Sequence, residues 1–172
     1  ILYIKSDTSL LHEIRKKQER VVFNVLQQYA RSSLFEKMYI VDNVLVENVL
    51  GDVPIKGYYD HLNNLIVSTM HMINVYKNSE AEMDTFSSNL DSARIATFGL
   101  VDDITGEEKL FYSLDTPREK MYYYAINDDQ LKNDGSLFKK ITNQVRNKVV
   151  DVKMKVSYGI YSTDYEQNYA YS

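Results

Sequence analysis

The apolar residues of this chain change their spacing about halfway along the sequence. Between Leu11 and Tyr76 they recur every three or four positions, which is the spacing of one face of a helix. From Ile95 onward they lie in short runs that alternate with polar residues and are bounded by Asp, Gly and Asn, as in strands joined by turns. Helices followed by a mostly antiparallel sheet predict an α+β fold, in which a long N-terminal helix and further helices pack on the sheet.

The length and composition are sufficient for one hydrophobic core. A chain of 172 residues that is 44% hydrophobic can bury roughly 70% of the surface that it exposes when unfolded. We therefore expect a single domain over residues 1–172. Its parts are an N-terminal helix over 1–30, a helical part over 31–92 and a mainly β part over 93–172, with a helix near 137–148.

The N-terminal helix is predicted to begin at Ser6, Asp7 or Thr8, any of which can cap its first turn. Its first half is mainly charged, so we expect that half to be solvated and burial to begin at Val21. The predicted apolar stripe consists of Leu11, Ile14, Gln18, Val21 or Val22, Val25 and Tyr29.

Two further segments complete the helical part. The apolar spacing of residues 34–50 favours a helix, although the same residues also fit two short strands about a turn at Asp42 and Asn43. Glycine and proline then interrupt the pattern between residues 51 and 57. A second long helix is predicted over residues 58–78.

The β part opens with the clearest hairpin of the chain, over residues 95–114, whose turn lies at 102–108. This turn carries five side chains with oxygen ligands that Ca²⁺ would accept, namely Asp102, Asp103, Thr105, Glu107 and Glu108. We favour a solvated turn, because turns collect Asp and Gly for their backbone geometry alone.

Two more strands and a helix follow the hairpin. Residues 121–126 read as a strand, and Ser136 can cap a helix over 137–148. Residues 149–162 alternate as a long strand, which we expect to pair with residues 165–171.

Composition and motifs argue against several classes of function. The net charge of −4 argues against a general nucleic-acid binder, which would need a basic patch, and the absence of cysteine leaves no disulfide, thiolate metal site or thiol nucleophile. The three histidines have no metal-ligand spacing, and no GxSxG, GxxxxGK[ST] or GxGxxG motif occurs. We therefore expect no enzyme activity, no metal and no cofactor.

One cluster of residues is a candidate ligand site. Arg118 and Lys120 directly precede Tyr122 and Tyr124 of a predicted strand, and Tyr112 lies in the second strand of the hairpin before them. An arginine fork here could hold a carboxylate or another anion while the rings cover its apolar part. The alternative is a polar loop followed by tyrosines that pack on the sheet.

The first four residues, Ile-Leu-Tyr-Ile, are apolar and precede the charged helix. They fit either the last turn of a membrane span that lies upstream, or a short edge strand. No apolar run within the 172 residues is long enough to cross a bilayer.

The order of these parts resembles the PAS-like or Cache sensor domains of bacterial membrane receptors, such as histidine kinases, diguanylate cyclases and chemoreceptors. The resemblance rests on an exit helix over residues 4–29 and on Leu100, Val101 and Asp102 followed by Gly106 in the first hairpin. It implies an extracytoplasmic domain between flanking membrane spans that senses a small molecule of unknown identity. It also implies a homodimer that forms through the N-terminal helix. The alternative is a pilin-like or other non-enzymatic assembly subunit.

Overall fold

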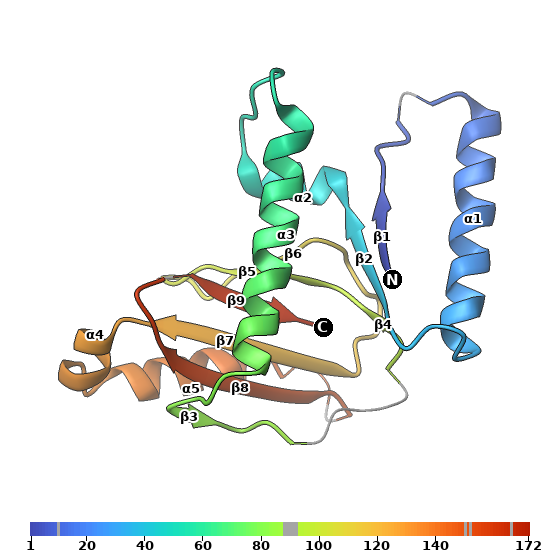
Figure 1. Ribbon diagram of the computed structural model, residues 1–172. Helices are drawn as coiled ribbons and strands as arrows, with labels where there is room; N and C mark the ends of the chain where they lie inside the picture. The colour runs from blue at the N-terminus through green and yellow to red at the C-terminus, as the bar shows by residue number, and fades with distance from the viewer. Residues whose placement is uncertain (10, 88–92, 150, 152, 166) are drawn as a thin grey trace.

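The computed structural model describes all residues except 10, 88–92, 150, 152 and 166, and its strands form two separate β-sheets (Figure 1). In chain order the elements are β1 (Leu2–Lys5), α1 (Glu13–Arg31), β2 (Met38–Asp42), α2 (Asn43–Leu50), α3 (Tyr58–Lys77), β3 (Met83–Asp84), β4 (Ile95–Ala96), β5 (Phe98–Val101), β6 (Glu108–Leu110), β7 (Glu119–Ile126), α4 (Asp128–Asn133), α5 (Leu137–Asn147), β8 (Lys155–Ser162) and β9 (Asn168–Tyr171).

The smaller sheet, called the parallel sheet below, has the order β1-β2-β4. All its pairings are parallel, and Tyr3 lies opposite Ile40. The first residues therefore form an edge strand, and their interpretation as the end of a membrane span is wrong. The outer edge of β1 pairs with no other strand in the described part of the chain, and the side chains of Leu2 and Ile4 are exposed.

The larger sheet, called the mixed sheet below, has the order β3-β8-β7-β9-β5-β6. The β5–β6 hairpin is confirmed, and β7 is the strand predicted after it. The predicted pairing of β8 with β9 is wrong, because β9 lies between β7 and β5 while β8 runs parallel to β7. The expected antiparallel PAS-like sheet is therefore wrong. Helices α4 and α5 together are long enough to make the crossover that parallel neighbours need.

Helix α3 confirms the predicted second helix and covers one face of the mixed sheet (Figure 1). Its buried residues are Leu62, Ile66, Thr69, Ile73 and Tyr76. The ring of Tyr76 lies 4.6 Å from that of Tyr161 and 5.9 Å from that of Tyr169, measured between centroids. Such aromatic contacts add about 0.5–1.5 kcal/mol each to the burial of apolar area.

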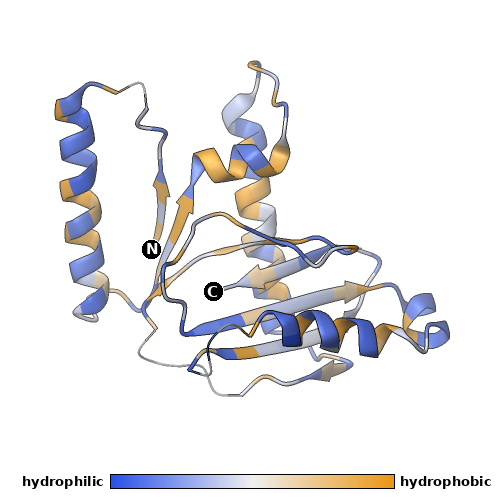
Figure 2. Ribbon diagram, turned by 180° about the vertical axis from the view of Figure 1, so that it is seen from behind, coloured by the Kyte–Doolittle hydropathy of each residue, from blue (hydrophilic) through white to orange (hydrophobic). Residues whose placement is uncertain are grey.

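Helix α5, also confirmed, covers the opposite face of the mixed sheet (Figure 2). Its buried side chains, Ile141 and Val145, pack with Tyr122 and Tyr124. Successive residues of a strand point to opposite faces, so Tyr123, between these two tyrosines, packs on the α3 side. The tyrosine-rich strand β7 is therefore buried on both faces.

Helix α1 begins at Glu13, later than predicted, and the side chain of His12 caps it by accepting from the Ile14 N–H. The side that packs on the parallel sheet includes Phe23, Leu26 and Ala30. The predicted apolar stripe lies on the other side: Ile14 is 63% exposed, Val21 60%, Val22 50%, Val25 42% and Tyr29 45%. Burial does begin after Val21, as expected, but through Phe23, Leu26 and Ala30, so the prediction is wrong for the apolar stripe itself.

Residues 34–50 were expected to form either one helix or two short strands. They form one strand, β2, followed by one helix, α2, so each expectation is correct for part of the segment. Asp42 marks the change, because it ends β2 and its carboxylate accepts from the Val44 N–H at the start of α2. The same carboxylate pairs with Lys5 of β1 at 2.5 Å. One aspartate thus caps the helix and ties the two strands together.

Thr97 joins the two sheets, because it lies between β4 of the parallel sheet and β5 of the mixed sheet. Its buried hydroxyl donates to the Ile40 carbonyl of β2 at 2.9 Å. Its backbone exchanges two hydrogen bonds with Ser172, of 2.7 and 3.0 Å. These bonds fix the end of β9 beside the parallel sheet and define the place where the candidate site lies.

Candidate functional site

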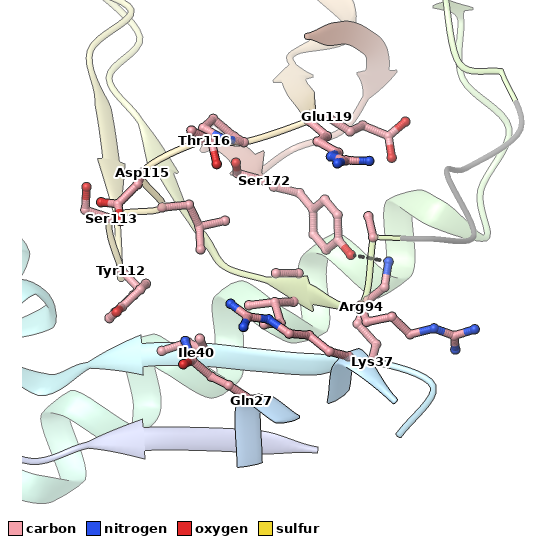
Figure 3. Close-up of a pocket in the computed structure, with 18 residues that line it drawn as sticks. Gln27, Lys37, Ile40, Arg94, Tyr112, Ser113, Asp115, Thr116, Glu119 and Ser172 are labelled. Carbon is pink, nitrogen blue, oxygen red and sulfur yellow. Dashed lines mark hydrogen bonds between the residues drawn. The ribbon is translucent and has the colours of Figure 1, made fainter. Parts of the chain in front are cut away.

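A cavity of about 480 Å³, called the junction cavity below, lies where the two sheets meet (Figure 3). Its walls come from the C-terminal part of α1, the start of β2, the segment around β4, the connection between β6 and β7, and the end of β9. The lining residues are Gln27, Arg31, Lys37, Ile40, Ala93, Arg94, Ile95, Ala96, Tyr112, Ser113, Leu114, Asp115, Thr116, Pro117, Arg118, Glu119, Tyr171 and Ser172.

Four cationic side chains from four different segments line this cavity: Arg31, Lys37, Arg94 and Arg118. The acidic residues of the lining are Asp115 and Glu119, and the buried Glu119 is already paired with Lys155 at 2.9 Å. The lining therefore carries more positive than negative charge, although the whole chain is acidic. An arginine-rich recess of this kind favours carboxylate or other anionic groups.

Tyr171 contacts two ammonium groups, that of Lys37 in the junction cavity and that of Lys77 on α3. Its hydroxyl accepts from Lys37 Nζ at 2.9 Å, as the dashed line in Figure 3 shows. Lys77 Nζ of α3 lies 3.8 Å from the centre of the same ring, a cation–π contact. Desolvation of this ammonium and the like charge of Lys37 lower the pKa of Lys77 to about 8, against the opposing effect of Glu119.

The structure brings together only part of the predicted ligand site. Arg118 and Tyr112 both line the junction cavity. Lys120 lines a neighbouring cavity of about 290 Å³, which Tyr112 also borders. Tyr122 and Tyr124 lie in the core beneath α5, because they point to the opposite face of the mixed sheet.

Lys120 and Tyr122 contact a different and mostly buried group, the carboxylate of Glu108. Lys120 Nζ lies 2.7 Å from Glu108 Oε2, and the Tyr122 hydroxyl donates to Oε1 at 2.6 Å. Lys148, which follows α5, completes the cluster at 3.2 Å from Oε1. These contacts join β6, β7 and α5, so the cluster stabilises the packing of that helix.

Three of the four cavity cations, Arg31, Lys37 and Arg94, were not predicted. They come from the end of α1, the residue before β2 and the residue before β4. No local spacing joins them in the sequence. The parallel pairing of β2 with β4 brings Lys37 and Arg94 together, and the packing of α1 on the parallel sheet adds Arg31. The sequence shows that each of the three residues is a cation, but it does not show that they lie close together in space.

The turn between β5 and β6 lies at the other end of the mixed sheet and is well ordered by hydrogen bonds. Asp102 Oδ1 accepts from the N–H groups of Ile104 and Thr105 and from the Thr105 hydroxyl, at 2.7–3.0 Å. These bonds hold the pKa of Asp102 below its ordinary value. This oxygen is therefore already engaged within the turn, and the choice of a solvated turn over a Ca²⁺ site stays a prediction.

The two sheets, with α3 packed against α2 and the mixed sheet, resemble the α/β fold of FtsZ-like proteins of known structure. The chain aligns with a dimer of FtsZ from M. jannaschii at a TM-score of 0.61 and 8% identity, over 99% of this chain and 52% of FtsZ. It aligns with CetZ from Methanosaeta thermophila strain DSM 6194 at a TM-score of 0.62 and 16% identity, over 99% of this chain and 51% of CetZ. The chain thus spans about half the length of each.

These identities are low, so the likeness establishes the fold alone. No protein-family model and no curated protein matches the sequence.

The shared fold overturns the resemblance to PAS-like or Cache domains, and with it the expected sensor function in a membrane receptor and the extracytoplasmic location. The pilin-like alternative is not supported either. Among the described residues, none of the helices combines the length and the apolar character that a bilayer crossing requires.

Proposed function

We propose that this chain is a non-catalytic assembly module that associates with further copies of itself. The observation that carries the proposal is the fold, which aligns over 99% of the chain with FtsZ, a protein seen as a dimer. Two features of the sequence support the non-catalytic part: it has no glycine-rich phosphate-binding motif and no cysteine nucleophile. The net charge of −4 argues that the partner is protein and not nucleic acid.

The exposed stripe of α1, formed by Ile14, Val21, Val22, Val25 and Tyr29, is the contact surface that we propose for a second copy. Apart from the adjacent Val21 and Val22, its members are separated by three, four or seven residues, so they lie along one side of the helix. All five are at least 42% exposed, and Figure 2 shows apolar segments between the polar ones along α1. Helices pair through stripes of this spacing, and large exposed apolar patches mark interaction sites.

The wild-type chain is expected to form dimers that dissociate on dilution, and Val22→Glu is expected to weaken them by about tenfold or more, which equals about 1.4 kcal/mol. A buried carboxylate in an apolar contact has no partner, so the dimer loses free energy while the monomer does not. Sedimentation velocity over a range of concentrations measures the effect.

The matched control is Val67→Glu, because Val67 is 63% exposed on α3 and lies outside the stripe. This control is expected to dimerise like the wild type. A wild-type chain that stays monomeric at every concentration, or equal losses in the two variants, would contradict the proposal.

The non-catalytic part has its own test. Incubation of the chain with Mg²⁺ and either GTP or ATP is expected to release no more phosphate than buffer alone, because the sequence carries no phosphate-binding loop. The assay is a phosphate-release measurement at concentrations where the chain is dimeric. Phosphate release that grows with protein concentration would overturn this part of the proposal and leave self-association standing.

A further inference from the structure

We propose that the junction cavity binds a small organic anion with two or three carboxylate groups, held by the guanidinium groups of Arg31, Arg94 and Arg118. This inference is independent of the proposed self-association, because none of the five residues of the α1 stripe lines the cavity. It assigns the cavity a ligand of defined chemistry: a short carbon skeleton that carries its negative charges at more than one end.

Two of the cavity cations, Lys37 and Arg94, lie side by side at the start of neighbouring strands. They directly precede Met38 and Ile95, which pair in the parallel sheet, and neighbouring strands are about 4.8 Å apart. The Met38 N–H also donates to the Arg94 carbonyl at 2.8 Å. Both cationic side chains line the cavity (Figure 3). Like charges on adjacent strands repel each other, and an anion bound beside them offsets that repulsion.

Arg31 and Arg118 approach the cavity from two other segments. Arg31 is the last residue of α1, and Arg118 directly precedes β7. Both are exposed, and neither makes an ion pair with another residue that the structure describes. The side chain of Arg94 donates one hydrogen bond of 3.3 Å, to the Glu36 carbonyl, although a guanidinium group has five N–H donors. Three guanidinium groups therefore retain donors for carboxylate oxygens.

Ser172 adds a buried polar group to the cavity wall (Figure 3). It is 8% exposed, and its hydroxyl has no hydrogen-bond partner within the described part of the chain. Buried hydroxyl groups in folded proteins are nearly always hydrogen-bonded, and one without a partner is unfavourable. A ligand oxygen at this wall would supply the missing acceptor.

The remaining wall of the cavity is apolar and suits a carbon skeleton. It includes Ile40, Ile95, Leu114 and Pro117. The volume of about 480 Å³ lies in the range of small-molecule sites, which combine apolar walls with a few polar groups that fix the orientation of the ligand. An inorganic anion would leave this wall uncovered, whereas an organic acid covers it.

The wall also favours carboxylate over phosphate groups. Proteins often bind phosphate through backbone N–H groups at a helix N-terminus or in a glycine-rich loop. The helix at this cavity is α1, and it contributes Gln27 and Arg31 from its C-terminal part, the end that carries partial negative charge. No glycine occurs among the described residues of the lining. The anion donors are therefore side chains, and a guanidinium fork matches the two oxygens of a carboxylate.

Isothermal titration of the chain with citrate tests the proposal, because citrate carries three carboxylates on a short carbon skeleton. Succinate and inorganic phosphate are titrated in parallel, and NaCl keeps the ionic strength equal, so that general screening is not mistaken for binding. Citrate is expected to bind at one site per chain, and succinate and phosphate are expected to bind more weakly. Citrate binding should also weaken as NaCl is raised, because salt screens its ionic contacts.

Arg94→Gln and Arg118→Gln each remove one guanidinium group and are expected to weaken citrate binding by about tenfold or more. Arg118→Lys keeps the charge but loses the planar fork, so we expect an intermediate loss. The matched control is Arg146→Gln, because Arg146 is exposed on α5, which covers the face of the mixed sheet opposite α3. Its citrate affinity should stay within about twofold of the wild type, since salt screens distant charges. Far-ultraviolet circular dichroism checks that each variant is folded.

The absence of binding heat up to about 10 mM citrate would overturn this inference. Equal weakening by Arg118→Gln and Arg146→Gln would do the same, because it would show a response to net charge and not to the cavity. Phosphate that binds more tightly than citrate, and that is lost in the two cavity variants, would identify a phosphate site instead. None of these outcomes affects the sedimentation test of the α1 stripe, so the two proposals can fail separately.

Discussion

Replacing Glu108 with alanine is expected to lower the free energy of unfolding by about 3–5 kcal/mol, because it leaves two mostly buried ammonium groups without their counter-charge. Lys120 and Lys148 are each 16% exposed and Glu108 is 14% exposed, so water replaces little of the lost interaction. The Tyr122 hydroxyl, which donates to Glu108, also loses its acceptor. Urea unfolding followed by circular dichroism measures the change.

Two controls separate the charge of Glu108 from its size and position. Glu108→Gln keeps an acceptor for Tyr122 but removes the charge, so we expect an intermediate loss. Glu13→Ala breaks the exposed pair between Glu13 and Lys16, in which Glu13 is 74% exposed, and it should change stability by less than about 1 kcal/mol. Equal effects of Glu108→Ala and Glu13→Ala would show that the buried cluster does not stabilise the fold.

The same cluster gives the protein an acid-side pH dependence. Burial raises the pKa of Glu108, but hydrogen bonds from Lys120 and Tyr122 and the charges of Lys120 and Lys148 outweigh it, so the net pKa is lowered. A carboxyl with a lowered pKa in the folded state contributes stability above its ordinary pKa and loses it as pH falls through the folded value. The Gln variant should therefore lose less stability than the wild type on acidification.

The second large effect is expected at alkaline pH, where the protein should unfold cooperatively above about pH 10, the ordinary pKa of tyrosine. Burial raises the pKa of Tyr161 and of Tyr169 to about 12. It also raises the pKa of Tyr122, Tyr123, Tyr124 and Tyr171, chiefly through desolvation. In each case the folded state favours the protonated phenol.

The sign of the alkaline effect follows from proton linkage. A group with a raised pKa in the folded state stabilises the fold below its unfolded pKa and loses that contribution as pH rises through the folded value. Each such tyrosine removes up to about 1.4 kcal/mol per pH unit in that window. Lys77 acts in the opposite sense between pH 8 and 10.5, because its pKa is lowered in the fold, but it is one group against several tyrosines.

Tyrosinate absorbance and circular dichroism, recorded together during alkaline titration, check this prediction. We expect the tyrosinate signal and the loss of secondary structure to rise in one shared step. The Tyr123→Phe variant lacks one tyrosine whose ionisation is linked to unfolding. The fraction of unfolded protein should therefore rise less steeply with pH than in the wild type. Ionisation of the tyrosines with secondary structure retained to pH 12 would contradict the assignment of these rings to the core.

The parts of the fold that the sequence predicts correctly are those that local patterns determine. Helix α3 repeats its apolar residues at helical spacing over its full length, and α5 does the same. The β5–β6 hairpin is marked by its turn residues. These elements are confirmed because neighbouring residues along the chain are also neighbours in the structure.

Strand order depends on partners that are distant in sequence, and it could not be predicted. The short connection between β8 and β9 suggested a hairpin, but β9 pairs instead with β7 and β5. The apolar residues of β2 suggested a helix, because a strand in a parallel sheet is buried on both faces and lacks alternation. The α1 stripe was identified correctly as a stripe, but its exposure depends on which side of the helix meets the parallel sheet.

The candidate site shows the same limit. Arg118 and Tyr112 were predicted to lie together, and both line the junction cavity. Tyr122 and Tyr124 were grouped with them because they are close in sequence, but strand alternation directs them to the face that α5 covers. Whether the cavity binds a ligand of any kind remains a prediction.

Strand β9 follows all the other described strands in the sequence, yet it lies between β7 and β5 inside the mixed sheet. The β5–β6 hairpin can form from local contacts, but it joins β7 and β8 only through β9. Phe98 pairs with Tyr171, so this pairing cannot form before Tyr171 has been synthesised. Pairings between residues so distant in sequence also form slowly. During synthesis, therefore, the mixed sheet remains in two pieces until residues 168–171 have left the ribosome.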